Sequence, residues 1–377
     1  MDRKRVMERA QAALRRLRQE EWPRARLALR QALAGWRGLG LFWAVVLGLL
    51  VGGVGMLAWL GPLPGHAPAA ASEAPATPEA PQAAAARAAG PEPVLDAASR
   101  GPVPGRPIPA ADPALLENGP YGRLPRVGPE GRSSIRAYGR GFDRQDTRPK
   151  VGLIVGGLGL NAAVSEEAIR RLPGAVALAF SPYAPRVELL LDQARAKGME
   201  VLVALPLEPS GYPMNNPGDR ALLTGLSAAE NGDRLLWVLS RFTGYVGAVG
   251  ALGPMRGERF AQLTDSLGTL QANLTGRGLL YIDPRPGAVR APARAWGRGV
   301  DLVVDEPATR SEIERKLARL EALAREGGSA LGYAGEASPV LVDRIAAWAG
   351  GIEGRGLVLA PVTAMLRRPE QDPARAP

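Results

Sequence analysis

Cysteine is absent from this chain of 377 residues, and histidine occurs once, as His66. Without cysteine the chain has no disulfide and no thiolate metal site, which is compatible with either side of a membrane. A single histidine excludes metal sites built from several imidazoles and argues against a histidine general base. Any chemistry of this protein must therefore come from other side chains.

Aromatic residues are also scarce, with seven Trp, seven Tyr and five Phe, although the net charge is +10. Proteins that bind nucleic acids gather Lys and Arg in a recognisable motif, often with aromatic side chains that stack on bases. In this chain the arginines are spread along the whole sequence. We therefore expect no nucleic-acid partner.

One long run of residues lacks charge. Residues 39–60 contain no charged side chain, and 22 residues are enough to cross a hydrocarbon core of about 30 Å. Residues 1–37 hold 11 Lys and Arg against four Asp and Glu, so the positive-inside rule places this tail in the cytoplasm. We predict a single-pass signal anchor over residues 38–61 in the cell inner membrane, with the C-terminal part in the periplasm. The membrane is then the first expected partner.

Two alternatives apply to this N-terminal region. Small residues at 67–72 offer a cleavage site, but the long basic segment and the long apolar run favour an uncleaved anchor over a signal peptide. The basic tail could lie as an amphipathic helix on anionic lipid, although we favour a segment whose charge only sets topology. Residues 62–147 are rich in Pro, Ala and Gly and predict a disordered linker, with 132–148 as an arm that could contact the next domain.

Short apolar runs alternate with helical patterns over residues 148–369, which predict one globular domain followed by a tail over 370–377. Capping-box patterns start helices at Ser227 and at Ser311. About eight strands that alternate with helices predict an α/β fold with a parallel sheet, curled into a closed or nearly closed β/α barrel. The expected strands are 151–155, 175–180, 200–205, 245–249, 279–283, 301–304, 330–332 and 357–361.

Active sites of such barrels lie at the C-terminal ends of the strands. Carboxylates there could bind Mg²⁺ or Ca²⁺, or hydrolyse glycosides as a pair, and arginines could hold an anionic or sugar ligand. The alternative, which we favour, is that the carboxylates pair with nearby arginines and shape the mouth of the barrel. The polar residues at these positions are Glu208, Arg256, Glu258, Arg259, Asp283, Arg285, Asp301, Asp305 and Tyr333.

The strand ends, taken in order, resemble the divergent polysaccharide deacetylase family. The similar fragments are Leu158-Gly159-Leu160-Asn161, residues 178–184, 198–209, 212–213, 216–218, 244–247, 277–279, Asp283 with Arg285, and residues 359–363. The resemblance implies a deformed β/α barrel of about seven to eight strands that acts on envelope carbohydrate. It also implies a divalent metal such as Zn²⁺, whose bound water attacks an acetyl carbonyl with the help of a carboxylate base.

The chain departs from the family pattern where the metal ligands are expected. Gly156 and Gly157 replace two aspartates, and Ala204 and Ala251 stand where histidines often occur. Residues 332–334 replace a Gly-His-Pro turn. We therefore expect no bound metal. The candidate catalytic residues are Asp283 and Glu208, and the candidate ligand-binding residues are Arg256, Glu258, Arg259, Arg285, Tyr333 and Asn161.

These features predict a membrane-anchored, periplasm-facing protein that binds glycan, such as a peptidoglycan-like polysaccharide, with a degenerate deacetylase site. One alternative is a carbohydrate hydrolase whose site has moved to carboxylates such as Glu208, Asp283 and Asp305. Another is a non-catalytic envelope scaffold, for which the anchor itself is the function. The oligomeric state is left open by the sequence.

Overall fold

The computed structural model describes residues 43, 46–48, 105–287 and 295–368. The predicted cytoplasmic tail, nearly all of the predicted anchor, the first part of the predicted linker with His66, and the tail over 370–377 lie outside these residues. Among the described residues, no helix combines the length and the apolar character needed to cross a bilayer. Residues 105–287 and 295–368 all belong to one compact unit, Pro91–Pro377.

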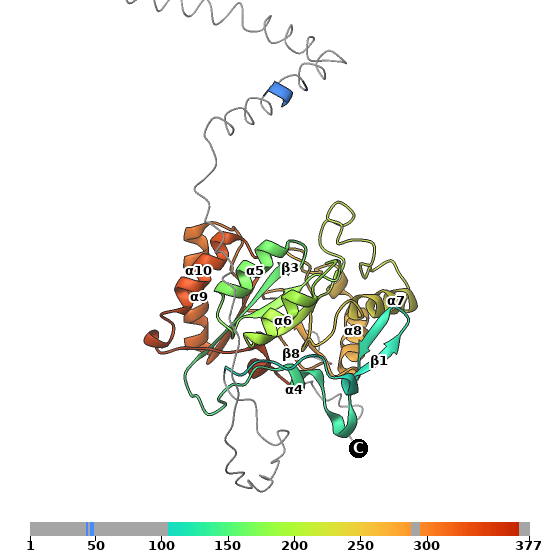
Figure 1. Cartoon of the computed structure of the whole chain (residues 1–377), viewed down its shortest axis with the longest axis horizontal. Helices are drawn as coiled ribbons and strands as arrows, with labels where there is room; N and C mark the ends of the chain where they lie inside the picture. The colour runs from blue at the N-terminus through green and yellow to red at the C-terminus, as the bar shows by residue number, and fades with distance from the viewer. Residues whose placement is uncertain (1–42, 44–45, 49–104, 288–294, 369–377) are drawn as a thin grey trace, which may run out of the picture. The chain divides into compact units, whose positions relative to one another are not determined.

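A parallel sheet of nine strands forms the centre of this unit (Figure 1). The strand order is β8-β7-β6-β5-β4-β3-β10-β9, and β11 pairs with β3 outside that path. Strand β8 pairs with β7 and β9 pairs with β10, and only residues 300–301 separate β8 from β9 in the chain. The sheet curls into a deformed β/α half-barrel. The strands are β3 (Lys150–Leu158), β4 (Ala177–Phe180), β5 (Val201–Ala204), β6 (Gly247–Val249), β7 (Leu280–Asp283), β8 (Gly297–Gly299), β9 (Leu302–Val303), β10 (Ser329–Ala334) and β11 (Val358–Leu359).

Six longer helices follow strands of the sheet, in the alternation that the sequence predicts. They are α5 (Ala162–Arg171), α6 (Glu188–Ala196), α7 (Ala228–Leu239), α8 (Thr264–Gly276), α9 (Arg310–Gly327) and α10 (Pro339–Ala349). Shorter 3₁₀ turns connect the elements: η1 (Pro113–Leu115), η2 (Pro129–Gly131), η3 (Phe260–Gln262), η4 (Glu353–Arg355) and η5 (Val362–Met365).

The two predicted capping boxes have different outcomes. Ser227 caps α7 as expected, because its hydroxyl accepts from the Glu230 N–H while the Glu230 carboxylate accepts from the Ser227 N–H. The second box is wrong. Helix α9 begins before Ser311: Thr309 is its N-cap residue, and the Thr309 carbonyl already accepts from the Ile313 N–H. Ser311 therefore lies inside the helix.

The strands bury both faces, which is the usual arrangement in a parallel sheet covered by helices. In β3, Val151, Leu153 and Val155 contact the outer core between sheet and helices, whereas Ile154 faces an inner core. The inner core fills the barrel with residues of other strands, such as Leu202 and Leu280. This alternation follows from the two-residue period of a strand.

Residues 105–149, which we call the arm, are folded, although we expected a linker up to residue 147. The arm contains an antiparallel hairpin of β1 (Leu116–Gly119) and β2 (Gly122–Pro125), followed by α4 (Ser134–Tyr138). Isolated apolar side chains among the Pro and Gly residues explain the difference, because they are buried against the domain. These buried residues include Ile108, Leu115 and Tyr138, all in the inner core.

The arm crosses the N-terminal ends of the strands. The Ile108 N–H donates to the Arg195 carbonyl at 2.8 Å, and the Arg140 guanidinium donates to the Gly198 carbonyl just before β5. Farther along, Ser133 lies against Gly278, which precedes β7. The arm therefore covers the end of the barrel opposite the C-terminal strand ends.

Candidate functional site

Two glycines near the C-terminal end of β3 lie directly against the end of β10. A Cβ atom added to Gly156 would lie 2.9 Å from the Tyr333 Oη, and 3.2 and 3.3 Å from the carbonyl oxygens of Gly335 and Ala334. Gly157 has φ +71°, and a Cβ there would lie 2.9 Å from the Gly335 oxygen. A left-handed backbone and contacts this close favour glycine. The space beside these two glycines is therefore filled by neighbouring atoms, and the glycines themselves carry no acidic group. We call this glycine pair, which lies at a register shift within β3, the closed turn.

Tyr333 is fully buried inside the barrel, where its hydroxyl donates to the Gly253 carbonyl at 2.7 Å. This bond joins β10 to the loop that follows β6. Burial raises the pKa of the Tyr333 phenol, so the hydroxyl stays protonated and acts as a donor. In the structure Tyr333 fills the space beside Gly156 and ties β10 to the loop after β6.

Asp305 follows β9 and is buried with only one oxygen satisfied. Its Oδ2 accepts from the N–H groups of Gly335 at 2.7 Å and Glu336 at 3.0 Å. Its Oδ1 has no hydrogen-bond partner within the described residues. Burial raises the pKa of this carboxyl, against the lowering effect of the two N–H donors.

Charged side chains lie at three of the strand ends, in two groups. Arg256, from the loop after β6, contacts the Glu306 carboxylate after β9 and lies 3.6 Å from the Glu258 carboxylate. At the end of β7, Arg285 donates two hydrogen bonds to Asp283, at 2.9 and 2.7 Å, and these bonds raise the pKa of the guanidinium. Glu258 is close enough to act electrostatically on Arg285. Together these residues offer both hydrogen-bond donors and acceptors at the C-terminal ends of the strands. We call them the charged rim: Arg256, Glu258, Asp283, Arg285 and Glu306.

Glu208 follows β5 and is almost completely buried, with 3% of its surface exposed. Its carboxylate accepts from the backbone N–H and hydroxyl of Thr224 and from the Arg259 Nε at 3.1 Å. Its carbonyl oxygen accepts from the N–H groups of Arg259 and Phe260. Glu208 therefore fastens two loops together, while the Arg259 side chain stays largely exposed.

The remaining sequence candidates occupy different places. Asn161 is the N-cap of α5, where its Oδ1 accepts from the Val164 N–H at 3.2 Å. Asp301 precedes β9 and accepts from Arg298 and from the Leu331 N–H, so it lies at the start of that strand and outside the rim. Glu306 was missing from our candidate set, and its position directly after Asp305 at a strand end is the signal that could have found it.

A separate cavity of about 180 Å³ opens between α7 and α8. Apolar side chains such as Leu235 and Leu270 line it together with the polar side chains of Asp265 and Asn273. None of the sequence-predicted site residues lines this cavity.

Comparison with known proteins decides the family. The family model described as divergent polysaccharide deacetylase matches residues 153–366, more than half of the chain. The chain belongs to the divergent polysaccharide deacetylase family. No curated protein matches the sequence.

Two solved structures are similar to this divergent polysaccharide deacetylase-like protein. The uncharacterized protein ATU2773 of Agrobacterium tumefaciens C58 is 33% identical, with a TM-score of 0.60, and the match covers 65% of this chain and 99% of that one. The catalytic domain of a peptidoglycan N-acetylglucosamine deacetylase of Eubacterium rectale is 10% identical, with a TM-score of 0.39. That second match covers 60% of this chain and 93% of the other.

The divalent metal that the family implies does not fit the residues of this protein. The space next to Gly156 and Gly157 is taken by Tyr333 and by the backbone of Gly335. Within residues 105–287 and 295–368 no three His, Cys, Asp or Glu side chains come together in a group that could hold a metal ion. The positions where family histidines often occur are alanines buried in the inner core. The site therefore supports no step that runs through a metal.

Proposed function

We propose that this polysaccharide deacetylase-like protein is a membrane-anchored, periplasm-facing glycan-binding protein that has lost metal-dependent deacetylation. The observation that carries the loss of chemistry is the closed turn, in which Tyr333 and Gly335 fill the space beside Gly156 and Gly157. The observation behind the anchor and the orientation is the apolar run of residues 39–60 with its basic flank.

The charged rim supports a binding role. Arg256, Glu258 and Glu306 are partly exposed, with 20%, 28% and 43% of their side chains accessible. Each guanidinium has several N–H donors and each carboxylate has several acceptor sites, so part of their capacity remains for the hydroxyl, amide or carboxylate groups of a sugar chain. Because each charge already has an opposite neighbour, a neutral or weakly charged glycan suits the rim better than a polyanion.

Binding and turnover can be measured on the full chain purified in detergent. Calorimetry with acetylated chitooligosaccharides and peptidoglycan fragments is expected to show binding, and acetate release and metal content are expected to stay at background. Arg256→Ala should weaken binding about tenfold by removing a charged hydrogen-bond donor. Arg310→Ala, an exposed arginine on α9, is the control that should leave binding unchanged. Stoichiometric metal with metal-dependent acetate release would overturn the proposal.

The orientation can be tested in cells because the chain has no cysteine. A Leu189→Cys variant places one thiol at a position that is 66% exposed. Periplasmic exposure predicts that a membrane-impermeant maleimide labels intact spheroplasts that make this variant. Labelling only after lysis would place the domain in the cytoplasm.

A second candidate function is a carbohydrate hydrolase. Asp305 is a better candidate for its proton donor than Glu208 or Asp283. Those two carboxylates are each paired with an arginine, whereas Asp305 is a buried carboxyl with a raised pKa and a free Oδ1. Such a group has the protonation state of a general acid, and it could donate a proton to a leaving oxygen once local opening exposes its buried Oδ1. If the wild type hydrolyses any glycan, Asp305→Asn should abolish turnover and keep binding. An active Asp305→Asn protein would eliminate this candidate.

A further inference from the structure

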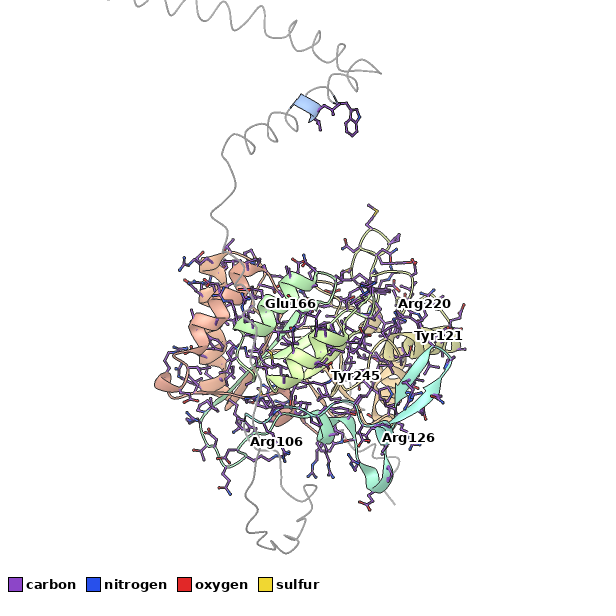
Figure 2. The ribbon with its side chains drawn as sticks, in the orientation of Figure 1. Arg106, Tyr121, Arg126, Glu166, Arg220 and Tyr245 are labelled. Carbon is purple, nitrogen blue, oxygen red and sulfur yellow. The ribbon has the colours of Figure 1, made fainter. Side chains whose placement is uncertain are left out.

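One end of the domain carries arginines that have no acidic partner. All of them are exposed, and none forms an ion pair with an acidic side chain of the described residues. They come from the arm and from the segment after η5, and Figure 2 shows two of them, Arg106 and Arg126, along the lower side of the domain. We call this surface the basic end: Arg106, Arg126, Arg136, Arg144, Arg367 and Arg368.

Contacts place three of these arginines at the N-terminal ends of the strands. The Arg106 carbonyl lies beside Gly198, which precedes β5. Arg367 pairs with Gly297, the first residue of β8. Arg136 is in α4, between the points where the arm reaches Gly278 and Gly198. The basic end is therefore opposite the charged rim.

The charge excess of the folded domain is concentrated in the arm. The arm, residues 105–149, has eight arginines against five Asp and Glu. Residues 151–287 and 295–368 have 22 Lys and Arg against 22 Asp and Glu, and are neutral as a group. Three of the five acidic residues in the arm are already held in ion pairs, Asp112 and Asp146 within the arm and Glu117 with Arg277. A positive surface that is not neutralised internally favours an anionic partner.

Apolar side chains accompany this charge. Trp296 is 39% exposed just before β8, and the Arg368 guanidinium carbon lies 6.0 Å from its ring centroid. Val127 is 41% exposed at the same end, next to Gly278. Exposed tryptophan with surrounding arginine is typical of surfaces that sit at the lipid headgroup region.

The described domain begins at the same end. Residue 105 is followed at once by Arg106, and the predicted anchor over residues 38–61 lies upstream of it in the chain. We propose that the basic end docks on the anionic lipid surface of the bilayer that holds the anchor. Three observations converge on this partner: the unneutralised arginines, the exposed Trp296, and the entry of the chain at this face.

Docking in this orientation points the charged rim away from the bilayer, toward a glycan layer. The lipid contact uses residues that are at the opposite end from Arg256 and Asp305. Lipid docking and glycan binding can therefore fail separately.

The test uses single-cysteine variants of the full chain incorporated into nanodiscs. Val127→Cys places a thiol at the basic end, and Leu189→Cys places one at the first turn of α6, near the C-terminal strand ends. The rate of labelling by a bulky maleimide is compared between discs of phosphatidylcholine alone and discs that also contain phosphatidylglycerol. We expect phosphatidylglycerol to slow labelling of Val127→Cys at least about fivefold, and to leave Leu189→Cys unchanged. High salt should restore the faster rate, because it shortens the screening length.

Charge reversal provides the second part of the test. Arg367→Glu with Arg368→Glu should abolish the protection of Val127→Cys, whereas Arg310→Glu with Arg315→Glu on α9 is the matched control and should keep it. Equal labelling rates in both kinds of disc, or protection that survives the Arg367/Arg368 reversal, would each overturn the proposal. Tight binding of the full chain to a soluble polyanion with no lipid protection would assign the basic end to that other partner.

Discussion

Returning aspartates to the closed turn should destabilise the domain without creating a metal site. At Gly157 a side chain meets two costs. The left-handed backbone at φ +71° costs a non-glycine residue about 1–2 kcal/mol. The contact of 2.9 Å with the Gly335 oxygen adds an overpacking cost of about 1–3 kcal/mol. Gly157→Asp should therefore lower the free energy of unfolding by about 2–5 kcal/mol, and the melting temperature by about 5–15 °C.

A matched glycine separates the two costs. Gly356 has φ +75° and no atom within 4 Å of an added Cβ, so Gly356→Asp carries only the backbone cost of about 1–2 kcal/mol. Thermal unfolding followed by circular dichroism would compare the two variants, and elemental analysis would measure zinc in Gly156→Asp/Gly157→Asp. A double variant that melts like the wild type and binds one zinc ion per chain would refute the closed-turn argument.

Three further predictions concern buried or charged groups. Tyr333→Phe should cost about 1 kcal/mol, because the Gly253 carbonyl loses its donor, and should make Gly156→Ala less costly in a double-mutant cycle. Burial raises the pKa of the Glu200 carboxyl above its ordinary 4.5. The folded state therefore favours the neutral carboxyl, and the free energy of unfolding should fall as the pH rises through the raised pKa. Glu200→Gln should remove this pH dependence, as measured by urea unfolding at a series of pH values. The pKa of Asp343 is lowered to about 2 mainly by the hydrogen bond from Arg344, so NMR titration of Arg344→Ala should show it moving back toward 3.8.

The pattern of apolar residues in the sequence was enough to predict the central strands of the fold. All eight expected strands are present, because runs such as residues 151–155 are apolar on both faces and lie between charged and glycine-rich segments. Strand β8 was missed, since the sequence Gly297-Arg298-Gly299 has neither the length nor the side chains of a typical strand. The folded arm was mostly missed too: its buried side chains are isolated among Pro and Gly and show no period.

The candidate site could be predicted only in part. Strand ends are visible in a sequence, so Arg256, Glu258 and Arg285 could be selected from it. The structure places Arg256 3.6 Å from Glu258 and pairs Arg285 with Asp283. Their pairing was not visible, because it depends on loops that converge from different strands. The sequence also showed that Gly156 and Gly157 carry no acidic group. It did not show that Tyr333 fills the space beside Gly156, because that contact depends on the packing of β10 against β3. The catalytic and ligand-binding roles assigned to these residues stay predictions.

The carboxyl group of Glu200 also affects the order in which the parts of the domain can form. It accepts from the Arg140 N–H, 60 residues earlier in the chain, and from the Thr363 N–H, 163 residues later. The last strand, β11, pairs with β3, the first strand of the main sheet. Contacts this far apart in sequence slow folding, because the chain must close long loops before it gains them. A growing chain therefore cannot complete this domain until residues 358–363 have been synthesised, and until then the unfinished sheet is open to contacts with other chains.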